Sequence, residues 1–177
     1  MKTSSKNKIN HKSIIGGLIK NLSSKNGVER KKSRHLLAKI GTPAIAYLEE
    51  LISSEDLTTR WEAVKTVGQI KNKEGIPLLL KALNDEEFDI RWLAAEGLIA
   101  LGIISLIPLL EELAIKYQSV YFRLGAHHVL SELKKKNIYD DPADLLFLLN
   151  DFIKEPIIPV EVEKELSRLT RQSKNRE

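Results

Sequence analysis

The sequence predicts an all-α solenoid, an α–α superhelix built from about four stacked helical hairpins. Two observations support this fold class. An arginine recurs at intervals of 30, 31 and 32 residues, at Arg30, Arg60, Arg91 and Arg123. The apolar positions that follow each arginine recur every three or four residues, which indicates helices rather than strands. A hairpin of this length cannot bury its apolar stripe alone, so we expect adjacent repeats to stack.

The four arginines mark the start of the first helix in each repeat. A small residue follows three positions later, at Ser33, Ala63, Ala94 and Ala126, and aliphatic residues follow seven and ten positions later. These positions share one helix face, where the small residue allows close approach and the larger ones fill the space beyond. The first helices are expected within Glu29–Gly41, Thr59–Lys71, Ile90–Gly102 and Phe122–Lys134.

The second helix of each hairpin follows a short break. Gly41, Thr42 and Pro43 supply a helix stop, a cap and a proline suited to a first helical turn. Asp141 and Pro142 play the same part in the last repeat. The second helices are expected within Pro43–Ile52, Gly75–Asn84, Ser105–Ile115 and Pro142–Ile153.

These elements are expected to form one repeat domain over residues 13–172. An N-terminal cap over 13–26 precedes repeats over 27–56, 57–87, 88–118 and 119–154, and a C-terminal cap helix over 159–172 follows. Residues 1–12 and 173–177 are polar and charged, so we expect disordered tails there. Gly16 and Gly17 within the first cap are expected to mark close helix packing.

Composition and charge restrict the classes of function. No apolar run reaches the roughly 18 residues of a membrane span, no secretory signal precedes the helical pattern, and no cysteine is present. We therefore expect a cytoplasmic protein without disulfide or thiolate chemistry. Residues 1–34 carry ten Lys and Arg against one Glu, a balance of +9 within a net charge of +4, which leaves −5 for the rest. A uniformly basic nucleic-acid groove is therefore not expected.

The repeats resemble the HEAT family, in the short bacterial form also found in phycobilin lyases. Residues 83–102, LNDEEFDIRWLAAEGLIALG, carry the resemblance best, with Asp, then a hydrophobic residue and Arg, then Ala-Ala and a final Leu-Gly. The resemblance covers about Gly27 to Ile153 and implies an armadillo-like scaffold whose second helices line a concave binding face. It also implies that the arginines pair with turn carboxylates such as Asp56, Asp85 or Asp89, in preference to forming a phosphate-binding stripe. An accessory role in bilin attachment is implied by the resemblance alone.

The second helices carry the main binding prediction. Leu51, Leu83 and Leu113 are taken as equivalent buried positions, so that the residues two and five places earlier point outward. The outward residues form a charged row, Glu49, Lys81 and Glu111, and an apolar row, Ala46, Leu78 and Pro108. This surface suits a peptide or helix of a partner protein better than a polyanion, because two of its carboxylates would repel phosphates.

Two tryptophans support an alternative function. Trp61 and Trp92 each follow a repeated arginine directly, so they form either an aromatic platform for a base or side chain, or two seals between repeats. The basic N-terminus is likewise either a solubilising tail or a contact for nucleic acid or an anionic membrane surface. Nucleic-acid binding is therefore the alternative. HEAT-like alkylpurine DNA glycosylases use such tryptophans, but with a longer array and a basic groove.

No motif indicates catalysis or a bound metal. A Gly-rich phosphate loop, HExxH and GxSxG are all absent from the sequence. His35 lies in the first repeat and the adjacent His127 and His128 in the fourth, which is not metal-ligand spacing. The sequence therefore predicts a monomeric, non-catalytic scaffold that needs no cofactor and binds an unidentified protein through its second helices.

Overall fold

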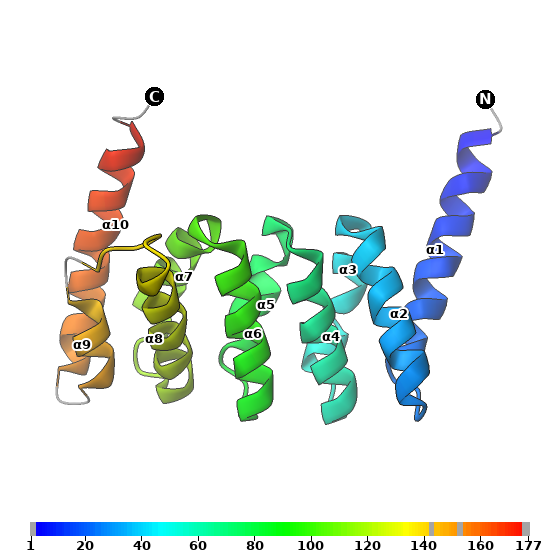
Figure 1. The fold of residues 1–177 in the computed structure, drawn as a ribbon, viewed down its shortest axis with the longest axis horizontal. Coiled ribbons are helices and arrows are strands. Elements are labelled where there is room, and N and C mark those ends of the chain that lie inside the picture. Colours follow the sequence, from blue (N-terminus) through cyan, green and yellow to red (C-terminus); the bar gives the residue numbers. More distant parts are fainter. Residues whose placement is uncertain (1–2, 142–143, 152–153, 175–177) are drawn as a thin grey trace.

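The computed structural model describes residues 3–141, 144–151 and 154–174, and these residues form helices joined by short turns, without strands. The predicted all-α solenoid is confirmed. Four first helices lie side by side in the front layer of Figure 1. They are α2 (Gly27–Ile40), α4 (Leu57–Ile70), α6 (Phe88–Leu101) and α8 (Val120–Lys135).

The second helices form the layer behind (Figure 1) and vary more in length. They are α3 (Ile45–Leu48), α5 (Ile76–Ala82) and α7 (Ile103–Lys116). The expected fourth second helix, α9 (Leu145–Asn150), packs instead against α8 and α10, and α10 takes the place beside α7. The 3-10 turns η1 (Thr42–Ala44) and η2 (Leu51–Ser53) flank α3, and η3 (Lys73–Gly75) precedes α5. The predicted ends of the last second helix, residues 142–143 and 152–153, lie outside the described residues.

One longer helix closes each end of the array. α1 (Thr3–Asn21) packs against α2 and α3, while α10 (Ile158–Lys174), after the turn η4 (Glu155–Ile157), packs against α7 and α9. Both helices extend past the same edge of the array (Figure 1). The start of α1 differs from the predicted tail over residues 1–12, because the segment before Gly16 contains no Gly or Pro to interrupt the helix. Likewise α10 includes residues 173–174 of the second predicted tail; residues 1–2 and 175–177 are outside the described part.

Side-chain caps explain where the first helices begin. Asn26 accepts a hydrogen bond from the backbone N–H of Val28, Asp56 from Thr59 at 2.7 Å, and Ser119 from Phe122 at 3.3 Å. Residues at positive φ follow three of these helices: Gly41 at 76°, Lys71 at 53° and Gly102 at 64°. Local chemistry therefore sets both ends of α2 and α4, the end of α6 and the start of α8.

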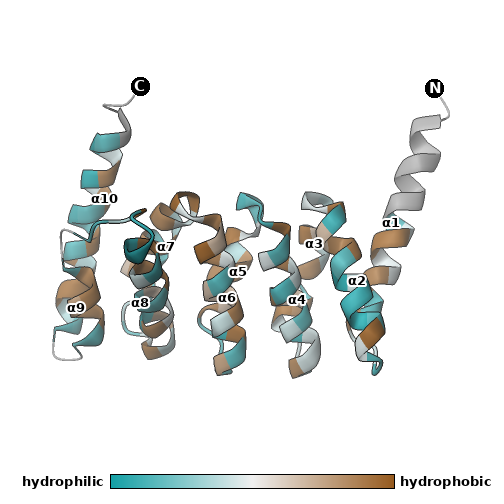
Figure 2. Ribbon diagram, viewed as in Figure 1, coloured by the Kyte–Doolittle hydropathy of each residue, from teal (hydrophilic) through white to brown (hydrophobic). Residues whose placement is uncertain are grey.

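The core lies between the two helix layers. The small residues three positions after each arginine are all buried, as are the aliphatic residues seven positions after it. Figure 2 shows much of α2 as hydrophilic and much of α7 as hydrophobic, so apolar character increases toward the middle of the array. The prediction for Gly16 and Gly17 is wrong, because both are exposed and nothing lies within 4 Å of a Cβ added to either. Their face of α1 points to solvent instead.

Candidate binding surfaces

The repeated arginines fasten each repeat to the turn that precedes it. Arg30, Arg60 and Arg91 each donate from Nη1 to the backbone carbonyl six residues earlier, at 2.8, 2.7 and 2.8 Å. Each arginine also contacts a residue further along the chain. These partners are Glu62 for Arg30, Asp85 for Arg60, the ring of Tyr121 for Arg91 and Glu155 for Arg123. Of the carboxylates expected in this role, Asp85 accepts from Arg60, while Asp56 caps α4.

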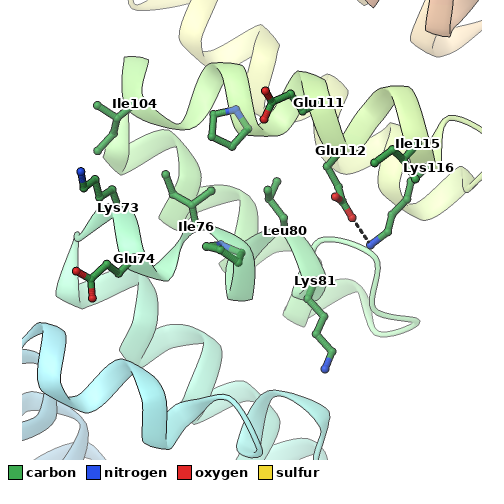
Figure 3. A pocket seen from close by; sticks show the side chains of 12 residues that line it. Lys73, Glu74, Ile76, Leu80, Lys81, Ile104, Glu111, Glu112, Ile115 and Lys116 are labelled. Atoms are coloured by element: carbon green, nitrogen blue, oxygen red, sulfur yellow. Dashed lines mark ion pairs between the residues drawn. The ribbon is translucent and has the colours of Figure 1, made fainter.

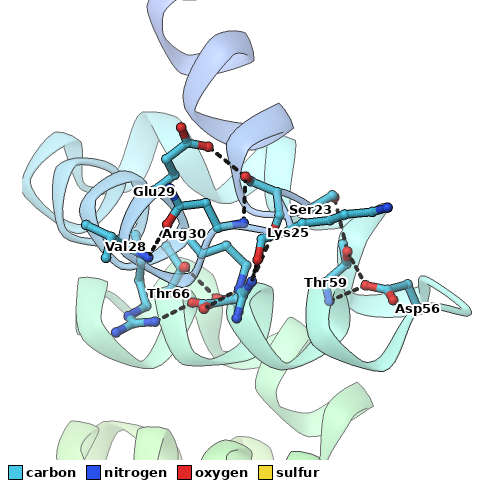
Figure 4. A network of polar contacts seen from close by, with 12 residues as sticks. Ser23, Lys25, Val28, Glu29, Arg30, Asp56, Thr59 and Thr66 are labelled. Atoms are coloured by element: carbon cyan, nitrogen blue, oxygen red, sulfur yellow. Dashed lines mark hydrogen bonds and ion pairs between the residues drawn. The ribbon is translucent and has the colours of Figure 1, made fainter.

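A buried carboxylate organises the first of these seams. Glu62 is 4% exposed and accepts hydrogen bonds from both Arg30, at 3.2 Å, and the buried Arg34. Thr66 donates its hydroxyl to the Glu62 carbonyl at 2.6 Å, and Thr59 donates to Asp56 at the same distance. Figure 4 shows this network spanning the loop after α1 together with α2 and α4. The arginines here are engaged within the fold.

The two tryptophans have different surroundings although they share one repeat position. Trp61 is half-buried, with Lys65 Nζ 4.1 Å and the Arg34 guanidinium 5.7 Å from its ring centroid. Burial lowers the pKa of Lys65, as does the charge of Arg34. Trp92 is exposed and stacks on His128, with ring centroids 4.6 Å apart. The rings therefore do not form one shared platform: cations cover Trp61, and Trp92 belongs to a separate patch.

The predicted rows on the second helices are only partly outward. Ala46, Glu49, Lys81 and Glu111 are exposed, and Pro108 is half-buried. Leu78 is only 8% exposed, so its predicted outward position is wrong. The reason is that α5 lies in the middle of the array and packs against α4, α6 and α7 together, which buries a wider arc than a surface helix has. The exposed apolar residue on α5 is Pro77.

A groove of about 720 Å³ lies between α5 and α7. Apolar side chains from both helices form its floor and edges: Ile76, Pro77, Leu80, Ile104, Pro108 and Ile115. Figure 3 shows Ile76 and Leu80 on α5 pointing toward α7, with Ile104 and Ile115 near opposite ends of α7. Three predicted residues, Lys81, Pro108 and Glu111, line this groove, whereas Ala46 and Glu49 lie outside it. The run of apolar residues in the sequence of α7 is the feature that could have indicated Ile104 and Ile115 as groove residues.

The groove has walls of opposite charge. The wall formed by η3 and α5 carries Lys73 and Lys81 with Glu74. The α7 wall carries Glu111 and Glu112 with Lys116, and Glu112 pairs with Lys116 at 2.7 Å. The first wall therefore has a net positive charge and the second a net negative one.

Histidines and buried acids elsewhere have structural partners. His127 is half-buried beside Asn150 Nδ2, at 2.9 Å from Nε2, and burial lowers its pKa. Asp141 accepts from the backbone N–H of Leu145 at 2.8 Å and from the hydroxyl of Tyr139 at 3.4 Å. Across the described ranges, no three His, Asp or Glu side chains are grouped to hold a metal ion. Nor does any helix there have the length and apolar character needed to cross a membrane.

Two layers of stacked helical hairpins define a helical repeat protein. Residues 15–99 match the family model of HEAT repeats, and the predicted resemblance is confirmed over this part of the chain. The CpcE–CpcF complex of phycocyanin lyase from Nostoc sp. PCC7120 has a similar structure, at 16% identity and a TM-score of 0.47 over 85% of this chain and 64% of that chain. This chain thus spans less than two thirds of the length of that neighbour.

A second similar structure is that of an engineered protein, at 16% identity and a TM-score of 0.41, over 84% of this chain and 76% of that chain. No curated protein matches the sequence.

Proposed function

We propose that this chain is a non-catalytic HEAT-repeat scaffold that binds one amphipathic helix of a partner protein in the groove between α5 and α7. The observation that carries the proposal is the combination of an apolar floor with walls of opposite charge. Repeat proteins commonly bind their partners on such extended surfaces between repeats.

The apolar lining is what the partner would cover. Ile115 is 75% exposed and Ile104 is about half exposed, although each would gain free energy by leaving water. Together with Pro77 they surround a depression, which distinguishes them from isolated surface apolar residues. An amphipathic helix would fill the depression with apolar side chains at three- and four-residue spacing.

The charged walls give the partner a direction. An acidic edge of the bound helix would lie along Lys73 and Lys81, and a basic edge would lie along Glu111 and Glu112. The reversed helix would bring like charges together, which disfavours it. The same carboxylates on the α7 wall would repel the phosphates of a nucleic acid.

The proposal is tested by replacing Ile115 with a photo-crosslinking amino acid in cells that naturally make the protein. The expected crosslink is to a segment with apolar residues at helical spacing, flanked by acidic residues on one edge and basic residues on the other. Mass spectrometry of the crosslinked peptide reads that pattern directly. A segment without it, or no crosslink at all, would contradict the proposal.

Val28 provides a matched control, because it is also 75% exposed but lies on α2 in the other layer. Once the crosslink has identified the partner, Ile115→Asp should abolish co-purification of that partner. Val28→Asp should leave co-purification unchanged. Both substitutions are at exposed helix positions, so neither is expected to unfold the protein. Equal loss in both variants would contradict the assignment to the groove.

Nucleic acid is the second candidate, favoured by exposed lysines on and around α1 and α2. They are Lys12, Lys20, Lys25, Lys31, Lys32 and Lys39. Binding there would appear as a mobility shift that weakens steeply with salt and weakens further when residues 1–12 are deleted. Absence of a shift at low salt would exclude this candidate. The Ile115→Asp variant separates it from groove binding, because it leaves these lysines intact.

A further inference from the structure

A second apolar depression lies in the other helix layer, between α6 and α8. It has a volume of about 220 Å³ and is lined by Phe88, Arg91, Trp92, Ala95, Leu124, Gly125 and His128. Phe88 is 63% exposed and Trp92 is 46% exposed, and Leu124 and Tyr121 beside them are also exposed. We call Phe88, Trp92, Tyr121 and Leu124 the Trp92 patch. Its size is below the usual range for small-molecule sites and suits a single large side chain.

The rings of the Trp92 patch are held in place by contacts within the fold. Trp92 stacks on His128 and lies tilted against Phe88, with ring centroids 6.3 Å apart. The guanidinium of Arg91 lies 4.5 Å from the ring centroid of Tyr121. A binding partner therefore would not have to order these side chains, which lowers the entropic cost of binding.

Acidic residues outnumber cations on and just before α6, although Arg91 lines the depression itself. Asp89 and Glu96 are exposed on the same helix as Trp92, and Glu86 and Glu87 precede that helix. The only cation on α6 is Arg91, whose Nη1 donates to the carbonyls of Asp85 at 2.8 Å and Glu86 at 2.7 Å. Glu96 Oε1 lies 3.4 Å from His128 Nε2. Carboxylates beside exposed aromatic faces favour a cation.

We propose that the Trp92 patch binds one arginine side chain of a partner protein segment. A guanidinium can stack on the face of Trp92 and meet the carboxylate of Glu96 in the same pose, a combination that suits arginine better than lysine. A nucleobase would stack equally well, but its phosphates would meet Asp89 and Glu96. This site lies in the first-helix layer, so it does not depend on the α5–α7 groove.

The test uses the full chain and two short peptides, acetyl-GLRLG-amide and the same peptide with citrulline in place of arginine. Citrulline keeps the shape of the side chain and removes its charge. Binding is followed through the indole N–H signals in a ¹H–¹⁵N NMR titration, in which Trp61 serves as the internal reference. The arginine peptide should shift the Trp92 signal saturably, and the citrulline peptide should bind at least about threefold more weakly.

Substitutions then test whether the Glu96 carboxylate is the group that contacts the arginine of the peptide. Glu96→Gln should weaken the arginine peptide about two- to fivefold and leave the citrulline peptide unchanged. Glu49→Gln, an exposed carboxylate in the other layer, should change neither affinity. Equal binding of the two peptides would overturn the proposal, as would a larger shift at Trp61 or no shift at ~10 mM peptide. A tighter response to a short oligothymidylate would also overturn it, in favour of a nucleobase site.

Discussion

Gly68 on α4 and Gly97 on α6 face each other across the seam between the second and third repeats. A Cβ added to Gly97 would lie 3.2 Å from the Cα of Gly68, and one added to Gly68 would lie 3.3 Å from the Cα of Gly97. The Leu79 side chain lies 3.0 Å from the same Gly97 position. Backbone meets backbone here, so α4 and α6 have little freedom to separate or slide without losing contact.

Gly97→Ala should therefore destabilise the protein. The new methyl group would push against the Gly68 backbone and the Leu79 side chain, at a cost of about 1–3 kcal/mol. Alanine's better helix propensity would return up to ~1 kcal/mol of this. We expect a lower midpoint in urea unfolding followed by circular dichroism.

Gly17→Ala on α1 is the matched control. It makes the same chemical change in a helix, but in open space. Helix propensity alone then applies, so the free energy of unfolding should rise by up to ~1 kcal/mol. If both variants were stabilised equally, the close approach at Gly97 would be refuted.

The arginine spacing was sufficient to predict the first helices and their buried faces, but not this glycine pair. Gly68 lies eight positions after its arginine and Gly97 six positions after its own. The two glycines therefore occupy different positions within their repeats, and a search for repeated residues passes over them. Their contact depends on the crossing of α4 and α6, which one repeat considered alone does not determine.

The second helices were predicted less well for a related reason. A wheel with 100° per residue places Leu78 away from Leu83, yet both are buried because α5 has neighbours on three sides. In the first repeat the helix is interrupted by 3-10 turns on both sides of α3, which advance about 120° per residue. Leu51, taken as a buried reference, is only half-buried there, while Leu48 and Ile52 are buried. Lys81, Pro108 and Glu111, predicted to point outward, nevertheless line the groove.

Glu62→Gln should be strongly destabilising, because Glu62 is a buried carboxylate. The change removes the carboxylate that pairs with both Arg30 and the buried Arg34, and it leaves a guanidinium in the interior without its counter-charge. Breaking a buried pair from one side costs about 3–5 kcal/mol. Thermal and urea unfolding measure this loss.

The double variant Glu62→Gln, Arg34→Met distinguishes the loss of the ion pair from the cost of leaving the Arg34 guanidinium buried without a counter-charge. Removing the guanidinium as well should recover part of the stability, because methionine fills space without requiring a counter-charge. Additive losses in the two single variants and the double variant would show that the two side chains are not coupled.

Lys71→Gly should stabilise the end of α4. Lys71 has left-handed backbone, with φ 53° and ψ 43°, at the place where Gly41 and Gly102 end their own helices with positive φ. A residue with a Cβ pays about 1–2 kcal/mol in this conformation, and glycine does not. The expected gain of roughly 1 kcal/mol is measurable by urea unfolding. Gln69→Gly, two residues earlier inside the helix, should instead lose about 1 kcal/mol; a gain there too would point to a general effect of glycine.

Tyr139 should make the protein sensitive to alkaline pH. Burial raises the pKa of its phenol above the ordinary value of 10.0, and the charges of Glu165 and Asp141 raise it further. The neutral phenol is therefore favoured by folding. Its contribution to stability is complete below pH 10 and is lost as the pH rises from there toward the folded-state pKa, because the unfolded chain releases the proton first.

Tyr139→Phe tests this dependence, because it keeps the ring and removes the titrating group. Between about pH 9 and pH 11 the free energy of unfolding of the unmodified protein should fall more steeply than that of the variant, with a difference in slope of up to ~1.4 kcal/mol per pH unit. Urea unfolding at each pH gives both slopes, and the lysines and remaining tyrosines titrate in both proteins alike. Parallel curves would mean that Tyr139 reaches solvent in the folded state, and with it that α10 does not stay closed over the end of the array.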